Sequence, residues 1–208
     1  MRDRLVAKAR TKVARLVLPY IEEQVHYTGI EINMPALQSN LSAIYRMDTV
    51  DPETGDLNVI IETPKGSRNK FDFDPEHGIF RLGGVLPEGA VFPFEFGFLP
   101  STLGEDGDPL DMIVLMDAPS CVGCLITARV IGVIEAEQTE KGKTERNDRL
   151  ISIATHAHLH SDIKSLKDIN AKLVDEMEHF FISYNQMRGK IFKPLGHFGP
   201  KPALELIE

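Results

Sequence analysis

The sequence Asp106-Gly107-Asp108-Pro109-Leu110-Asp111 runs almost directly into the apolar stretch 113–115 and places three carboxylates within six residues. Gly107 and Pro109 favour a sharp, fixed bend, and the apolar stretch predicts a strand, so the acids are expected at the mouth of a strand. Crowded carboxylates repel one another at neutral pH, and a hard cation such as Mg2+ relieves this because it takes oxygen ligands. We therefore predict a metal site here, against the alternative of a solvated acidic turn.

The composition indicates one soluble domain with an extension. The chain has 208 residues, of which 42% are hydrophobic, and no apolar run long enough to cross a membrane. The net charge of −8 disfavours a nucleic-acid binder, which needs clustered cations, although an acidic enzyme can bind an anion if metal ions supply positive charge. Two cysteines do not form a disulfide framework, so we expect a reducing, cytoplasmic location.

Residues 1–18 are rich in Lys and Arg, with apolar residues at helical spacing, and they predict a basic amphipathic helix that ends at Pro19. We expect this helix to pack on its own acidic domain or on a neighbouring subunit. Its arginine content also fits a transit peptide, but no serine-rich stretch accompanies it. The predicted organisation is an N-terminal extension over residues 1–50 and a catalytic domain over 51–208, beginning at the turn that starts with Asp51.

The stretch from Phe92 to Asp111 (FPFEFGFLPSTLGEDGDPLD), with Glu62 and Lys70 upstream, resembles the family I soluble inorganic pyrophosphatases. The signature of that family is an acidic D-G-D-P-x-D stretch after a Pro-x-x-aromatic-Gly segment. The resemblance implies hydrolysis of inorganic diphosphate to two phosphates, with several Mg2+ ions per site. It also implies a homo-oligomer and a five-stranded β-barrel of the OB type with peripheral helices.

The strand and helix patterns agree with an α+β fold built on a barrel. Strands are predicted at residues 57–62, 71–74, 112–116, 125–134 and 150–153. Apolar residues then recur at i, i+3, i+4 and i+7 from the expected N-cap Asp168 to about Gly189, which predicts a helix.

The resemblance also implies roles for individual residues. The acids expected at the metal site are Asp106, Asp111, Asp148, Glu62, Asp72 and Glu137. Glu140 is an alternative to Glu137, because the length of the loop leaves the two open. Asp108 is expected to accept or orient the proton of the attacking water. The groups expected to hold phosphate oxygens are Lys70, Arg149 and Tyr184.

The sequence departs from the family at several phosphate-contact positions. An arginine is replaced by Gly84, a lysine by Asn185, and two aromatic positions that are usually tyrosine are Phe92 and Phe96. One lost charged contact weakens transition-state binding by about 2 kcal/mol. Hydrolysis stays the leading prediction, and the alternative is a weakened relative that binds phosphate and metal in a regulatory or assembly role.

Two further patterns have ordinary interpretations. Cys121 and Cys124 have the C-x-x-C spacing of redox and zinc motifs, but no second pair exists, so turn thiols are predicted. His156, His158 and His160 alternate as they would on one strand face, yet a polar loop is the favoured prediction over a transition-metal site.

Overall fold

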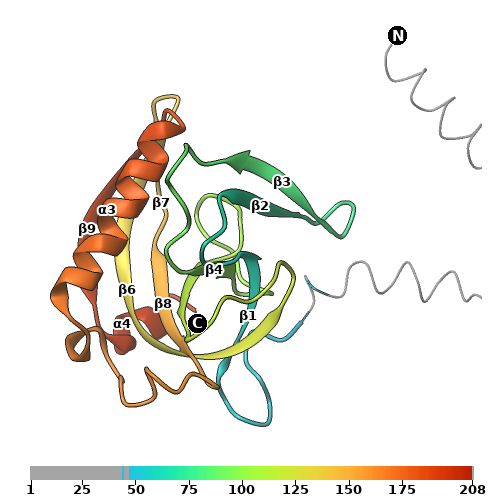
Figure 1. The fold of residues 1–208 in the computed structure, drawn as a ribbon, viewed down its shortest axis with the longest axis vertical. Coiled ribbons are helices and arrows are strands. Elements are labelled where there is room, and N and C mark those ends of the chain that lie inside the picture. Colours follow the sequence, from blue (N-terminus) through green and yellow to red (C-terminus); the bar gives the residue numbers. More distant parts are fainter. Residues whose placement is uncertain (1–43, 45–46, 208) are drawn as a thin grey trace, which may run out of the picture. The chain divides into compact units, whose positions relative to one another are not determined.

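Five strands of this computed structural model pair with one another in a ring (Figure 1). In the order of pairing they are β1 (Leu57–Thr63), β4 (Glu95–Phe98), β5 (Asp111–Leu115), β8 (Arg149–Ala154) and β6 (Leu125–Glu140), and β6 returns to β1. The β5–β8 pair is parallel and the other four pairs are antiparallel. The structure describes residue 44 and residues 47–207. The basic helix predicted at 1–18 and most of the predicted extension therefore lie outside the described residues.

The remaining elements surround this ring. The strands β7 (Lys143–Arg146) and β9 (Ile191–Phe198) pair with β6, whereas β2 (Asn69–Asp74) and β3 (Ile79–Val85) form a separate two-stranded sheet. The helical elements are η2 (Leu166–Asp168), α3 (Ala171–Met187) and α4 (Pro200–Glu205). In Figure 1 α3 runs beside β9. The described part of the chain is thus mostly β-sheet with few helices, and none of its helices is long and apolar enough to cross a bilayer.

The core forms where the strands bury their apolar side chains. The strand β5 is buried from Met112 to Leu115, and every residue of β8 is buried. The helix α3 contributes Val174, Met177 and Phe181, which share the face that the i, i+3, i+4, i+7 pattern predicted. Burying a side chain of this size contributes about 1.5–3 kcal/mol, so this face holds the helix on the sheet.

All five predicted strands are present, but β6 continues to Glu140, and β3, β4, β7 and β9 were not predicted. The predicted N-cap of the long helix was wrong. The Asp168 carboxylate accepts hydrogen bonds from the Lys164 and Ser165 backbone nitrogens and closes η2, so it is not available to α3. The true cap is Asn170, whose side-chain oxygen accepts from the Lys172 backbone nitrogen at 3.0 Å.

The histidine and cysteine patterns lie outside regular structure, as predicted. The segment that carries His156, His158 and His160 follows β8 as turns, and Asp117 accepts from the His158 backbone nitrogen at 2.8 Å. Cys121 and Cys124 occupy the turn before β6 as free thiols.

Candidate active site

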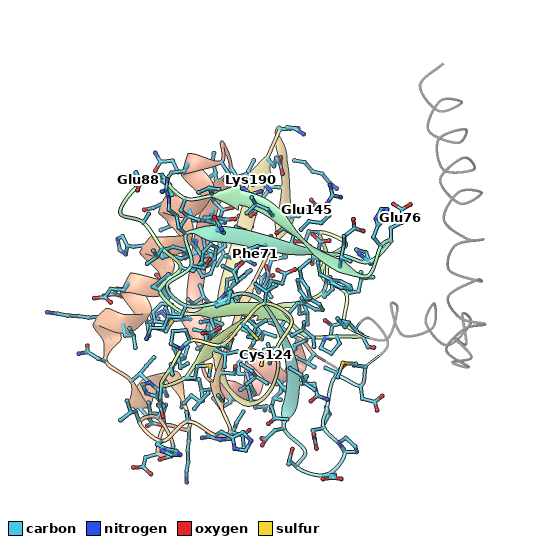
Figure 2. The ribbon with its side chains drawn as sticks, turned by 45° about the vertical axis from the view of Figure 1, so that its right-hand side comes forward. Phe71, Glu76, Glu88, Cys124, Glu145 and Lys190 are labelled. Carbon is cyan, nitrogen blue, oxygen red and sulfur yellow. The ribbon has the colours of Figure 1, made fainter. Side chains whose placement is uncertain are left out.

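Most of the predicted acids line a cleft of about 350 Å³ between the ring of strands, the β2–β3 hairpin and the C-terminal end of α3. The carboxylates that line it are Glu62, Asp72, Asp106, Asp108 and Asp111, and the cations are Lys70, Arg149, Arg188 and Lys190. Lys190 and Glu145, both labelled in Figure 2, also border a smaller adjoining hollow together with Asp106 and Asp108. The cleft thus places carboxylates and cationic side chains within reach of one small ligand.

The tight turn before β5 positions three of the acids. Gly107 has a φ of +88°, which glycine tolerates and other residues rarely adopt. The Gly104 backbone nitrogen donates to the Asp108 carbonyl at 2.7 Å, and the Asp108 backbone nitrogen donates to the Asp106 carboxylate at 3.2 Å. These bonds aim the Asp106 and Asp108 side chains at the cleft. Burial, and then the charges of Asp106 and Asp72, raise the pKa of Asp108 above its usual value.

Lys70 lies at the centre of an ion-pair cluster on the cleft wall. Its ammonium nitrogen lies 3.0 Å from Glu62 Oε2 and 2.8 Å from Asp72 Oδ1, and only 6% of the residue is exposed. Burial alone would lower the pKa of Lys70, but the nearby Glu62 and Asp72 carboxylates outweigh burial and raise it. Lys70 is therefore a fixed positive charge, and its partners hold it in place for an anion.

Arg149 forms a second buried pair, with Asp111. Arg149 Nη1 lies 2.5 Å from Asp111 Oδ2, and Arg149 is 5% exposed. The guanidinium lies over three aromatic rings, with its carbon 5.1–5.9 Å from the centroids of Phe96, Phe181 and Phe192. Burial raises the pKa of Asp111 to about 6, although Arg149 opposes the shift.

The opposite rim of the cleft is formed by the C-terminal end of α3 and the residues that follow it. Arg188 Nη1 donates to the Tyr184 hydroxyl, and the guanidinium carbon lies 5.4 Å from the centroid of the Tyr184 ring. Lys190 pairs with Glu140 at 2.9 Å. Among the described residues, Arg188 is the cleft cation that makes no ion pair with a carboxylate. Its charge is consequently available to an anionic ligand.

The structure brings most of the predicted site residues to this cleft. Those that line it are Glu62, Lys70, Asp72, Asp106, Asp108, Asp111, Arg149 and Tyr184. Asn185 also lines the cleft, but its side-chain nitrogen donates back to the Phe181 carbonyl at 2.9 Å within the helix. Gly84 lines a neighbouring cavity with Lys70, Tyr184 and Arg188.

Two predicted metal-site acids do not line the cleft. Asp148 accepts hydrogen bonds from the Ala136 backbone nitrogen at 2.8 Å and from Arg146 at 2.9 Å. It lines a neighbouring cavity of about 340 Å³, which Asp106 and Asp111 also border. Glu137 lies 3.5 Å from Lys193 on β9. Glu140, the alternative to Glu137, borders only the adjoining hollow.

Two amides stand in the cleft instead, and sequence reasoning missed both. They are Gln138 and Asn147, each one residue from a predicted acid. Neighbouring residues on an extended chain point to opposite sides, so a shift of one residue exchanges a carboxylate for an amide. The amides offer neutral oxygens and make the cleft less negative than the predicted set would.

The chemistry of the remaining donors fits a hard divalent cation. The cleft acids offer only oxygen ligands, which Mg2+ prefers. Burial and repulsion between neighbouring carboxylates raise the pKa of Asp108, as expected where nearby cations do not offset the negative charge of the acids. Within residues 47–207, however, no three His, Cys, Asp or Glu side chains are already grouped closely enough to hold an ion.

Comparisons with known proteins show what the whole chain is similar to. A family profile described as inorganic pyrophosphatase matches residues 59–208. The inorganic pyrophosphatase of a Synechocystis species is 38% identical over 157 residues, which cover 76% of this chain and 90% of the relative. That of a Nostoc species is 37% identical over 145 residues, covering 70% and 83%. The crystal structure of the inorganic pyrophosphatase from Thermus thermophilus superimposes with a TM-score of 0.72 at 34% identity, covering 79% of this chain and 94% of that one.

Proposed function

This chain belongs to the inorganic pyrophosphatase family, and from that premise we propose how its cleft hydrolyses inorganic diphosphate to two phosphates. The enzyme is an inorganic diphosphatase, a hydrolase of a phosphoric anhydride. The observation that carries the proposed residue roles is the convergence of five carboxylates and four cations on one cleft. Diphosphate is densely anionic, so the cations bind it while the acids recruit metal ions that offset its charge.

Mg2+ is the proposed cofactor, with several ions per site. Its proposed ligands are Asp106 and Asp111 together with Glu62 and Asp72, which the cleft brings together. When bound, the ions polarise phosphorus and make water a better nucleophile at neutral pH. Asp148 and Glu137 are left out of the proposed ligand set because neither lines this cleft.

Asp108 is the proposed proton acceptor. Its pKa is raised by burial and by the charges of Asp106 and Asp72, which makes its carboxylate a better proton acceptor. Asp108 takes a proton from water as the water oxygen bonds to one phosphorus. The bond from that phosphorus to the bridging oxygen breaks, and the second phosphate leaves with the electron pair.

Lys70, Arg149 and Tyr184 are the proposed phosphate-binding groups, and Arg188 joins them. Lys70 and Arg149 are buried and held by acids, so they act as fixed charges on the cleft wall. The Tyr184 hydroxyl and the Arg188 guanidinium contact each other at the opposite rim. This arrangement grips the substrate from both sides and orients it for attack.

The direct test is phosphate release from diphosphate in the presence of Mg2+. Asp108→Asn keeps the shape of the side chain but removes its basicity, and we expect kcat to fall by about 10² to 10⁴. Asp162→Asn is the matched control, because Asp162 is an exposed acid outside the cleft, and its activity should equal wild type. Equal, negligible rates in wild type and Asp108→Asn would instead support the non-hydrolytic alternative, which nothing in the comparisons favours.

We further propose an OB-like barrel, a cytoplasmic location and a homo-oligomer. The closed order of pairing from β1 back to β1 supports an OB-like barrel. A cytoplasmic location fits the two free thiols, and light scattering on the purified chain tests the proposed homo-oligomer. The boundary between a 1–50 extension and a 51–208 catalytic domain stays a prediction.

A further inference from the structure

A second cavity of about 280 Å³ adjoins the cleft, and the proposed hydrolysis of inorganic diphosphate assigns it no role. Lys70, Tyr184 and Arg188 line both cavities. The rest of its wall is the segment 83–87 at the end of β3, together with Met187 on α3. The two cavities therefore meet at the Tyr184–Arg188 pair, where the one cleft cation without a carboxylate partner in the described chain lies.

Gly84 keeps this side cavity open. A Cβ atom at Gly84 would meet no heavy atom within 4 Å, so nothing else fills the space beside its backbone. The neighbouring Gly83 differs, because a Cβ there would come within 1.6 Å of Asp72 Oδ2. Gly84 pairs with Lys70 across the hairpin, which places the opening directly beside a cleft cation.

Unlike the cleft, the side cavity has no carboxylate among its lining residues. Val85 is 54% exposed and Met187 is 51% exposed, and Pro87 and the buried Leu86 line the cavity beside them. Inorganic diphosphate is anionic throughout and gains nothing from such a wall. An apolar, flat group does gain, because covering exposed apolar side chains is favourable and aromatic and guanidinium planes stack on heterocyclic rings.

We infer that this enzyme also accepts nucleoside diphosphates, with the two phosphates in the cleft and the base in the side cavity. The inference rests on the proposed function, because the same cleft performs the chemistry. Arg188 holds the inner phosphate where the cavities meet. Water attacks the terminal phosphorus, the bond to the bridging oxygen breaks, and the products are a nucleoside monophosphate, inorganic phosphate and a proton, with no further reactant.

The experiment compares kcat/KM for adenosine diphosphate and for inorganic diphosphate, on the same full-length preparations with Mg2+. Gly84→Leu places a large side chain in the side cavity. We expect the kcat/KM for adenosine diphosphate, divided by that for inorganic diphosphate, to fall by about tenfold or more. Met187→Ala removes part of the wall at an exposed position, and a fall of about threefold is expected. Leu82→Ala is the matched control, since Leu82 is an equally exposed apolar residue of β3 outside both cavities.

The outcomes separate the two proposals. Hydrolysis of inorganic diphosphate without any of adenosine diphosphate overturns the inference alone. Nucleotide hydrolysis whose ratio is the same in wild type, Gly84→Leu and Met187→Ala also overturns it, because the base would then lie elsewhere. If wild type hydrolyses neither substrate, the proposed function fails together with the inference. If circular dichroism shows that Gly84→Leu does not fold, the change in the ratio for Met187→Ala decides whether the inference holds.

Discussion

Replacing Arg149 with Met removes the positive charge that faces Asp111, and we expect its cost in stability to grow with pH. Arg149 Nη1 lies 2.5 Å from Asp111 Oδ2, and Arg149 is 5% exposed. Breaking a buried ion pair costs about 3–5 kcal/mol. Because 23% of the Asp111 side chain stays exposed, we expect the lower end, a loss of about 3 kcal/mol in the free energy of unfolding at pH 8.

The pH dependence follows from the pKa of Asp111. Burial raises that pKa from 3.8 to about 6 in the folded protein, even with Arg149 present. Since the folded state then binds a proton that the unfolded state has released, this group makes the free energy of unfolding fall as pH rises through that window. Losing Arg149 raises the folded pKa further, and each additional unit adds about 1.4 kcal/mol to the cost at high pH. At pH 5 Asp111 is protonated in both folded proteins, so the substitution costs less.

Urea unfolding followed by far-ultraviolet circular dichroism, at pH 5 and pH 8 with EDTA, measures both costs. Lys143→Met is the control, because Lys143 pairs with Glu145 at the surface and 75% of its side chain is exposed. Such a pair contributes about 1 kcal/mol or less, with little difference between the two pH values. An Arg149→Met cost that is equal at both pH values, or larger at pH 5, would show that Asp111 does not depend on this charge.

Three further outcomes are expected. Removing Mg2+ with EDTA should abolish phosphate release, and calorimetry should show Mg2+ affinity falling as pH drops below about 6, because protonated Asp111 must release its proton to bind the ion; constant affinity from pH 5 to 8 would contradict this. Tyr184→Phe should lower kcat/KM for diphosphate about tenfold, since a hydrogen bond to a charged oxygen is lost, and an unchanged value would remove Tyr184 from the phosphate site. Phe181→Ala should lower the free energy of unfolding by about 3–5 kcal/mol in urea denaturation, because Phe181 is 3% exposed among packed rings; a loss below 1 kcal/mol would refute the packing argument.

The acidic turn could be predicted from the sequence because its geometry is local. Gly107 supplies the left-handed backbone, and Asp106, Asp108 and Asp111 follow from the same short stretch. The long helix could also be predicted, because the spacing of its apolar residues indicates a helix without knowledge of the rest of the fold. Short-range chemistry therefore located the centre of the site.

The sequence could not show that Gln138 and Asn147 line the cleft where Glu137 and Asp148 were expected, because the residue that faces the cleft depends on how distant strands pair. Glu137 and Gln138 are neighbours on β6, whereas Asn147 and Asp148 are neighbours in the short link between β7 and β8. Which member of each pair faces the cleft is set by pairing with other strands, and the length of the intervening loop hides that register. The signal in the sequence is the amide next to each acid, Gln138 after Glu137 and Asn147 before Asp148.

Some strands were missed for a different reason. The strand β9 contains Pro194 and Gly196, residues that disfavour strands, and its pairing with β6 is interrupted by a bulge between Glu135 and Ala136. The strand β3 contains the glycine pair discussed above. Long-range pairing stabilises these segments against their local preferences.

The division of the strands into two sheets implies that the cleft joins two cooperative units. Lys70 and Asp72 belong to the β2–β3 hairpin, whereas Asp111 and Arg149 belong to strands of the ring, and no backbone ladder connects the two sheets. Side-chain bonds such as the one from the Phe73 backbone nitrogen to Glu62, at 2.8 Å, link them instead. Amides of the hairpin should therefore exchange with deuterium sooner than those of β5 and β8, and a bound anion that bridges Lys70 and Arg149 should slow the hairpin most.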